Sequence, residues 1–170
     1  MRHGNRLALV AGLAAGLGGL GIRGEAQTRT WRTATSGVFS TGSNWVGGVA
    51  PGSGNTAAFG LTASTTPFTV TFSGPATTAG LSVSNMPPTF SLAGFTYNVT
   101  GDSLVGGGNG PTLTLLNGTL NTRAGNGRLF IGQNTGQTGT VVVGAGGVLQ
   151  GVWEVGSSGT GTLNVQAGGQ

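Results

Sequence analysis

The sequence predicts an all-β fold of the solenoid type, in which short strands of successive coils stack on one another. Three observations predict it: a segment repeated near the C-terminus, short runs of alternating apolar residues, and no helical pattern after residue 26. One unit of such a repeat is too small to bury its own apolar face, so it must stack on a neighbouring unit. The repeat therefore decides the expected fold class.

The repeat lies between residues 131 and 169. Its first element returns after 24 residues and the later elements after 22, so the two copies differ by two residues in the loop after Gly132. A length change confined to a loop is typical of stacked coils. The paired elements are Ile131-Gly132 and Val155-Gly156, Thr140–Val143 and Thr162–Val165, and Gly146-Gly147 and Gly168-Gly169.

A weaker third copy precedes these two. Val105-Gly106 matches Ile131-Gly132 at an offset of 26 residues, and Thr112–Leu115 matches Thr140–Val143 at an offset of 28. Because residues two apart lie on the same side of a strand, this alignment predicts columns of inward-facing side chains. The columns are Val105, Ile131 and Val155; Leu113, Val141 and Leu163; and Leu115, Val143 and Val165.

Short strands bounded by turn residues are expected along the rest of the chain. We expect each coil to contribute two or three of them, and equivalent strands of successive coils to pair in parallel. Asn117-Gly118 is also a hairpin signal, which keeps an antiparallel sandwich as an alternative. The expected strands are 68–72, 80–83, 90–92, 95–99, 104–105, 112–116, 129–131, 141–143, 153–155 and 163–165.

Residues 1–26 are expected to be a secretory signal peptide. Residues 2–6 include two arginines and a histidine, residues 7–20 are an apolar run, and Gly24 and Ala26 fit cleavage after Ala26. The run is shorter than the roughly 20 residues that span a bilayer, which disfavours a membrane anchor. The chain is therefore predicted to be exported, with no membrane span in its mature part.

The mature chain is expected to have two parts. Residues 27–66 contain several aromatic residues but no repeat, and they are predicted to cap the first coil, because an open coil exposes unpaired strand edges. Residues 67–170 are predicted to form the solenoid coils. The last residues fall in the middle of a repeat, so we expect either a fragment of a longer protein or an open end that pairs with another chain.

The charges of the mature chain exclude several classes of function. It keeps four arginines, one aspartate and one glutamate, a formal net charge of +2, and it has no lysine. Nucleic-acid binders cluster Lys and Arg on one face, so no nucleic-acid partner is expected. The chain has no cysteine, which leaves no disulfide and no thiolate metal site.

Catalytic and metal sites are not expected either. The mature chain has no His, and its only carboxylates, Asp102 and Glu154, belong to coils two steps apart, about 10 Å by strand spacing. Inverting glycosidases place their carboxylates about 6.5 to 9.5 Å apart, so we interpret this pair as two solvated side chains. The glycine-rich turns lack the repeated Asp of calcium-binding rolls. We therefore predict no enzyme activity, no cofactor and no metal site.

Two groups of residues have a structural interpretation beside a functional one. Arg123 and Arg128 share a loop in which they could contact an acidic polysaccharide, although such arginines more commonly keep a surface soluble. Gly106, Gly132 and Gly156 follow strands and are expected at the corners between walls, in conformations with positive φ. We interpret these glycines as structural.

Columns of threonine are also predicted. Thr112, Thr140 and Thr162 align with one another, and Thr138 aligns with Thr160. Regular threonine ladders on flat solenoids order water, which raises ice binding as a function, but cross-strand pairing of threonines is the ordinary explanation. The irregular loop lengths argue against a flat surface that matches a lattice, so ice binding is not the expected function.

The motifs resemble those of a known group of proteins. Between Trp31 and Phe59 the chain contains Ser36-Gly37-x-Phe39, Asn44-Trp45-x-Gly47-Gly48 and Ala50-Pro51. This segment resembles the start of large bacterial surface proteins with autotransporter-associated β-strand repeats. Residues 129–149 and 153–169 are similar to repeats of that group and of exopolysaccharide-associated sorting-domain proteins.

The resemblance implies a right-handed parallel β-helix on an exported protein of the cell surface or matrix. It implies no catalytic residues, and we expect the C-terminal translocating barrel or anchoring segment of that group to lie outside these residues. We therefore expect a non-enzymatic structural or adhesive scaffold, an N-terminal fragment of a larger autotransporter-like protein, with polysaccharide or cell-surface partners.

Two alternatives remain from the sequence. One is a carbohydrate-active β-helix whose catalytic coil lies beyond residue 170. The other is a sugar-binding module, in which exposed Trp31 and Trp45 would stack on sugar rings. Complete burial of both tryptophans would remove the main support of the sugar-binding module.

Overall fold

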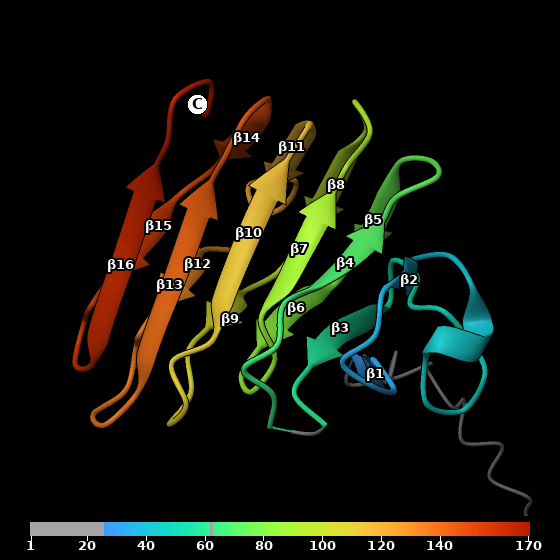
Figure 1. Ribbon diagram of the computed structural model, residues 1–170, viewed down its shortest axis with the longest axis horizontal. Helices are drawn as coiled ribbons and strands as arrows, with labels where there is room; N and C mark the ends of the chain where they lie inside the picture. The colour runs from blue at the N-terminus through green and yellow to red at the C-terminus, as the bar shows by residue number, and fades with distance from the viewer. Residues whose placement is uncertain (1–25, 62) are drawn as a thin grey trace, which may run out of the picture.

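The computed structural model describes residues 26–61 and 63–170, in which the chain forms a parallel β-solenoid of about six turns (Figure 1). This part of the chain contains sixteen short strands and one 3-10 turn, η1 (Gly42–Asn44). The all-β solenoid predicted from the repeat is therefore confirmed. Residues 1–25 of the expected signal peptide lie outside the described residues.

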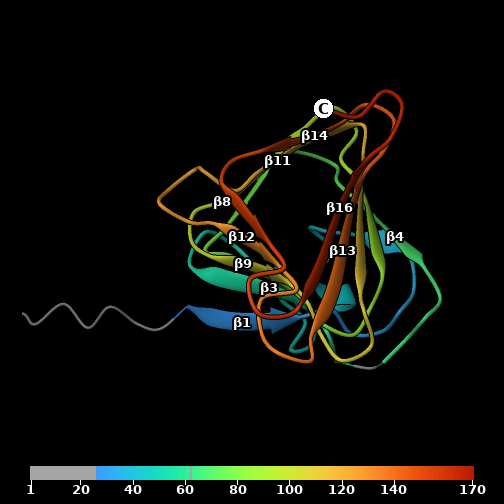
Figure 2. The ribbon, with the colours of Figure 1, turned by 90° about the vertical axis from the view of Figure 1, so that its left-hand side faces the viewer.

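The strands form three sheets, which make the three walls of the solenoid (Figure 2). The first sheet contains β1 (Gln27–Thr30), β3 (Asn55–Phe59), β6 (Gly80–Val83), β9 (Ser103–Val105), β12 (Leu129–Ile131) and β15 (Trp153–Val155). The second contains β2 (Gly37–Val38), β4 (Phe68–Thr71), β7 (Pro88–Ser91), β10 (Thr112–Leu116), β13 (Thr138–Val143) and β16 (Thr160–Val165). The third contains β5 (Ala76–Thr78), β8 (Thr96–Val99), β11 (Gly118–Asn121) and β14 (Gly147–Gln150).

Neighbouring strands are parallel in all three sheets, which excludes the antiparallel sandwich. Asn117, with a φ of 53°, and Gly118 form a turn between β10 of the second sheet and β11 of the third. The Asn117-Gly118 dipeptide, which suggested a hairpin, therefore forms a corner between two walls. Positive φ at these residues serves either kind of turn, so the dipeptide alone did not distinguish them.

The predicted columns are confirmed by the register of the strands. Each position of the repeat pairs with its equivalent in the coil before and the coil after, and the side chains of the inner coils face the core. The pairs are Val105 with Ile131 and Ile131 with Val155, Leu113 with Val141 and Val141 with Leu163, and Leu115 with Val143 and Val143 with Val165.

Six strands were not predicted: β1, β2, β3, β5, β11 and β14. β11 buries one large side chain, Leu120, among glycine and polar residues, and β14 carries Val148 and Leu149 next to each other, so neither strand shows apolar alternation. Four predicted strands have the predicted bounds, namely β6, β10, β12 and β15. The sequence therefore identified most strands of the first and second sheets and one strand, β8, of the third.

Residues 27–66 contain β1, β2 and β3. β1 pairs with β3, whereas β2 and β3 pair with β4 and β6 of the coils that follow. The loop between β1 and β3 carries aromatic side chains over the N-terminal end of the core. Trp31 packs edge-on against Trp45, with ring centroids 5.0 Å apart, and Trp45 Nε1 donates a hydrogen bond of 2.7 Å to the Phe39 carbonyl. The aromatic cluster that fills this end consists of Trp31, Phe39, Trp45, Phe59, Phe68, Phe72, Phe90 and Tyr97.

The C-terminal end of the core is uncovered. Val143 has no exposed surface, whereas Val165, its equivalent one coil later, is 53% exposed. Val155 and Trp153, on inward positions of β15, are 42% and 43% exposed. The interior columns of the solenoid therefore end as an apolar surface at this coil.

Two of the three corner glycines have the expected conformation. Gly132 and Gly156 have φ values of 64° and 68°, but Gly106 has no positive φ, so the prediction was wrong at that residue. A Cβ on Gly132 would lie directly against the carbonyl oxygen of Thr160 in the next coil. At Gly132 the corner thus excludes a side chain both by its backbone conformation and by close packing of the coils.

Candidate functional site

The two carboxylates of the described residues, Asp102 and Glu154, are not brought together. Asp102 immediately precedes β9 and Glu154 is the middle residue of β15, with β12 between these strands. Two steps of strand spacing separate them by about 10 Å along the axis. Asp102 Oδ1 accepts a hydrogen bond of 3.1 Å from the Arg128 backbone N–H, and Phe130 is the register neighbour of Glu154. Each carboxylate therefore has a separate local setting on the outside of the first wall.

The two loop arginines lie in the turn between β11 and β12. Both Arg123 and Arg128 are exposed.

Among the described residues, no group of three His, Cys, Asp or Glu side chains is placed to hold a metal ion. Within the same part of the chain, no helix has the length and apolar character needed to cross a membrane.

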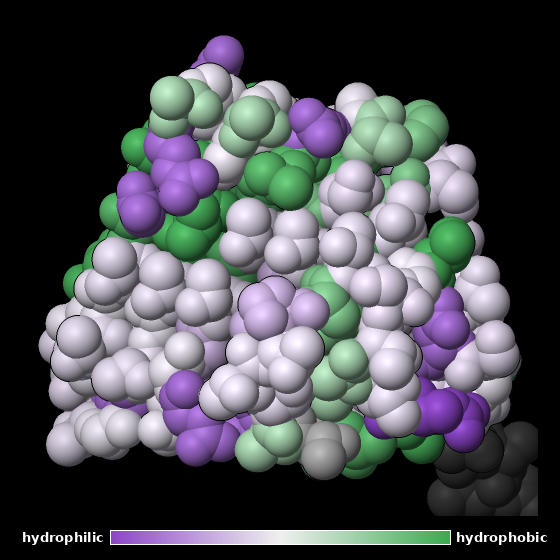
Figure 3. Space-filling view, viewed as in Figure 1, coloured by the Kyte–Doolittle hydropathy of each residue, from purple (hydrophilic) through white to green (hydrophobic). Residues whose placement is uncertain are grey.

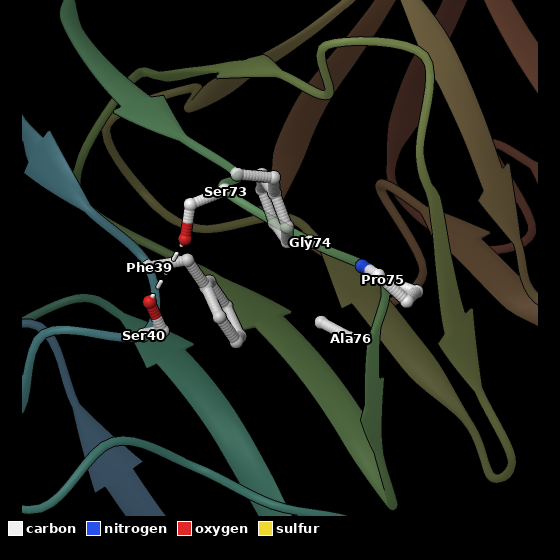
Figure 4. A pocket seen from close by; sticks show the side chains of 7 residues that line it. Phe39, Ser40, Ser73, Gly74, Pro75 and Ala76 are labelled. Atoms are coloured by element: carbon white, nitrogen blue, oxygen red, sulfur yellow. Dashed lines mark hydrogen bonds between the residues drawn. The ribbon is translucent and has the colours of Figure 1, made fainter.

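A small cleft of about 110 Å³ lies between the chain after β2 and the chain after β4 (Figure 4). The hydroxyls of Ser40 and Ser73 are 3.2 Å apart at its edge. The rings of Phe39 and Phe72 stack with centroids 4.6 Å apart, but both are almost fully buried. The cleft therefore offers hydroxyl and backbone groups without an open ring face.

A wider and shallower hollow of about 330 Å³ lies beside the loop that precedes β4. Its lining includes Ser64, Thr65 and Asn109, none of which titrates near neutral pH. Neither hollow combines a nucleophile with a base, which nucleophilic catalysis requires within hydrogen-bond reach.

Trp31 and Trp45, which the sugar-binding alternative needs on the surface, are 1% and 0% exposed. Their rings pack on each other and on Phe59, with centroids 5.6 Å and 5.5 Å from it. Stacking on a sugar needs a ring face open to solvent, so these two residues serve the core. The main support for a sugar-binding module is thereby removed.

The outer face of the second sheet carries the most regular set of polar side chains in the described chain. Five strands of this sheet, β4, β7, β10, β13 and β16, each present two hydroxyl-bearing residues that are spaced two apart and directed outward. The pairs are Thr69 and Thr71, Thr89 and Ser91, Thr112 and Thr114, Thr138 and Thr140, and Thr160 and Thr162. We call this surface the threonine face.

The register joins these pairs into a continuous array. Thr89 lies beside Thr69 on one side and Thr114 on the other, and Thr140 lies between Thr112 and Thr162. The columns predicted from sequence, Thr112 with Thr140 and Thr162 and Thr138 with Thr160, are confirmed. The pairs on β4 and β7 were missed, although a Thr-x-Thr or Thr-x-Ser triplet recurring once per coil would have found them.

Comparison of the chain with protein-family models, with curated proteins and with solved structures gives no significant match. The assignment of a function therefore rests on the residues and their arrangement.

Proposed function

We propose that this chain is a non-enzymatic structural and adhesive scaffold of the bacterial cell surface or matrix. The observation that carries the proposal is the set of parallel ladders that run in register through the coils, over a continuous core. A solenoid of this kind resists bending, because each coil is held to the next by hydrogen bonds on several walls and by stacked side chains. A stiff solenoid of this kind can hold other molecules at a fixed distance and present its outer walls to them.

The two ends of the solenoid support a role in assembly. The aromatic cluster fills the N-terminal end, in keeping with a cap formed by residues 27–66, whereas β15 and β16 leave apolar inward positions open. Exposed strand edges and apolar positions favour pairing with a further coil-shaped surface. We propose that the scaffold extends or associates through the end formed by β15 and β16.

The sense of winding supports the proposed right-handed β-helix. In Figure 1 the strands of the second sheet run upward at the front, the chain passes to the back over the top, and successive coils advance to the left. That combination corresponds to a right-handed coil, which is also what the resemblance to autotransporter-associated repeats implies. Together with the signal-like residues 1–26, it favours an exported protein with polysaccharide or cell-surface partners.

The proposal is tested by following the full chain, with an epitope tag after Gln170, in a bacterial host. We expect mass spectrometry to find an N-terminus at Gln27, and we expect the exported protein to be retained by intact cells or by exopolysaccharide-coated surfaces. Leu13→Arg, which puts a charge into the apolar run, is the matched control and should leave the chain uncleaved in the cytoplasm. Cytoplasmic, uncleaved wild-type chain would contradict export, and exported protein that washes off both surfaces would contradict adhesion.

A further inference from the structure

The threonine face has the geometry of a two-dimensional grid. Neighbouring strands lie about 4.8 Å apart, and residues two apart along a strand lie about 6.6 Å apart. Figure 1 shows β7, β10, β13 and β16 side by side with nearly the same direction. Because each of the five strands carries an outward pair, the grid extends across about 19 Å of the wall.

The unequal loop lengths do not interrupt this grid. The residues that differ in number between coils lie in the turns between walls, such as residues 132–137 before β13 and the shorter turn of residues 156–159 before β16. Within the sheet, Thr112 still pairs with Thr140 and Thr138 with Thr160. The objection that irregular loops prevent a flat surface therefore does not apply to the threonine face.

The pairs do not all lie in the same two columns. The pair of β10 is displaced by one column from that of β7, and the pair of β13 by one column from that of β10. Val142 and Asn164 continue the column of Thr114 at the C-terminal end. The grid is thus a diagonal band, in which each strand shares at least one Thr–Thr contact with the next.

The chemistry of the band is uncharged and amphipathic. No Asp, Glu, Lys or Arg occurs in the strands of the second sheet, and Figure 3 shows pale rows over this face, with hydrophobic and hydrophilic patches toward the upper ends of the strands. The outward residues Leu116, Val142 and Asn164 carry no hydroxyl. Among the ten hydroxyls, only that of Thr138 makes a hydrogen bond within the described protein, to the Gly107 carbonyl at 3.5 Å. The other hydroxyls are free to bind water, and the methyl groups beside them limit how that water can orient.

We propose that the threonine face binds ice. The prism faces of hexagonal ice repeat their water oxygens on a rectangular grid of similar dimensions, so water held by the hydroxyl rows fits the growing crystal. A charged surface would orient its water around the charges, and this face has none. The proposal goes beyond the scaffold function and does not depend on export or adhesion.

Ice is favoured over a crystalline polysaccharide as the occupant of this face. The outward positions of β4, β7, β10, β13 and β16 include no aromatic residue that could stack on a sugar ring. Trp153, the exposed tryptophan of the described chain, belongs to β15 of the first sheet. A face of small hydroxyl groups fits a lattice of water better than a row of pyranose rings.

The test is the partition of the purified, fluorescently labelled chain into slowly growing ice. We expect enrichment in the ice, together with faceted ice crystals and slowed recrystallisation at low protein concentration. Thr114→Tyr and Thr140→Tyr place a bulky ring in the grid and should each lower the enrichment several-fold. Tyrosine is favourable in strands, so these variants should keep the fold, which circular dichroism checks.

The matched control is Thr119→Tyr, the same change at an outward position of β11 on the third wall. It should partition into ice as well as the wild type does. Exclusion of the wild-type chain from ice would overturn the proposal, and so would an equal loss for Thr119→Tyr. Retention on microcrystalline cellulose without entry into ice would overturn it in favour of a polysaccharide. For any variant that unfolds, Thr140→Val, which keeps the shape but removes the hydroxyl, gives a second measurement.

Discussion

Val143 and Val165 occupy the same column in consecutive coils, and they provide an internal comparison of a covered and an uncovered core position. The two residues are register partners, yet Val143 is fully buried and Val165 is about half exposed. Replacing each by alanine removes the same two methyl groups. The difference in cost therefore measures what the next coil contributes.

The expected magnitudes follow from burial. At Val143 the lost transfer free energy is about 1.6 kcal/mol, from about 0.8 kcal/mol per methyl-sized group. The cavity left between two coils raises the cost to about 2–3 kcal/mol. At Val165 about half of the transfer term is lost and solvent fills the space, so we expect about 0.5–1 kcal/mol.

Urea unfolding of Val143→Ala, Val165→Ala and the wild type measures both costs, provided that the slope of the transition is unchanged. The measurement is made at two protein concentrations well apart. Equal costs for the two variants, or a cost at Val165 that rises with concentration, would show that another surface covers the last coil in solution. Equal costs at high dilution would refute the reasoning that the core is open at this end.

Single residues yield three further predictions. Gly132→Ala forces a Cβ into positive φ against the next coil and should cost about 3 kcal/mol or more in urea unfolding, whereas Gly136→Ala, with φ 77° and open space, should cost about 1–2 kcal/mol. Burial raises the pKa of Tyr97, opposed by its hydrogen bond to Thr78, so stability holds below about pH 10 and falls above it as the unfolded tyrosine ionises. Alkaline urea titrations of Tyr97→Phe should show a smaller fall. Acrylamide should quench Trp153 preferentially, so Trp153→Phe removes most of the quenchable fluorescence.

Each of these has a contrary outcome. Equal costs for the two glycine variants would mean that the corner relaxes to admit a side chain. An identical alkaline decline in wild type and Tyr97→Phe would place the responsible ionisation elsewhere. Quenchable fluorescence that survives Trp153→Phe would show that the tryptophans at the N-terminal end are accessible to solvent.

The sequence was most informative where coils resemble one another. Residues 131–169 contain two clear copies, and the offsets between them predicted the pairs Val141 with Leu163 and Val143 with Val165. In-register stacking places equivalent residues side by side, so a repeat in the sequence predicts which residues of successive coils are in contact. The threonine columns of the last three coils followed from the same alignment.

The sequence was least informative where one wall or one end is irregular. β5 and β11 contain at most one large apolar residue each, and β14 has only the adjacent pair Val148 and Leu149, so none of them shows alternation. β1 and β3 lie among aromatic residues that suggested a loop. These strands are held by the backbone hydrogen bonds of their neighbours. A local pattern cannot reveal pairing that depends on residues one coil away.

The threonine face shows the same division. Each Thr-x-Thr pair is visible in the sequence, and strand alternation alone places both members on one side. Only the structure shows that these pairs form one band, because this depends on the registers of five strands and on the placement of the unequal loops at the corners.

The sequence by itself predicted a stack of short strands, because a repeated two-residue alternation buries its apolar side only by stacking. The parallel registers of the structure then excluded the antiparallel alternative. Only the tertiary structure decided which equivalent residues are buried. Val143 and Val165 occupy equivalent positions of the repeat and lie in the same column, yet Val143 is buried and Val165 is exposed. Burial depends on the coil above, and a coil more than twenty residues away is a non-local contact that no local pattern encodes.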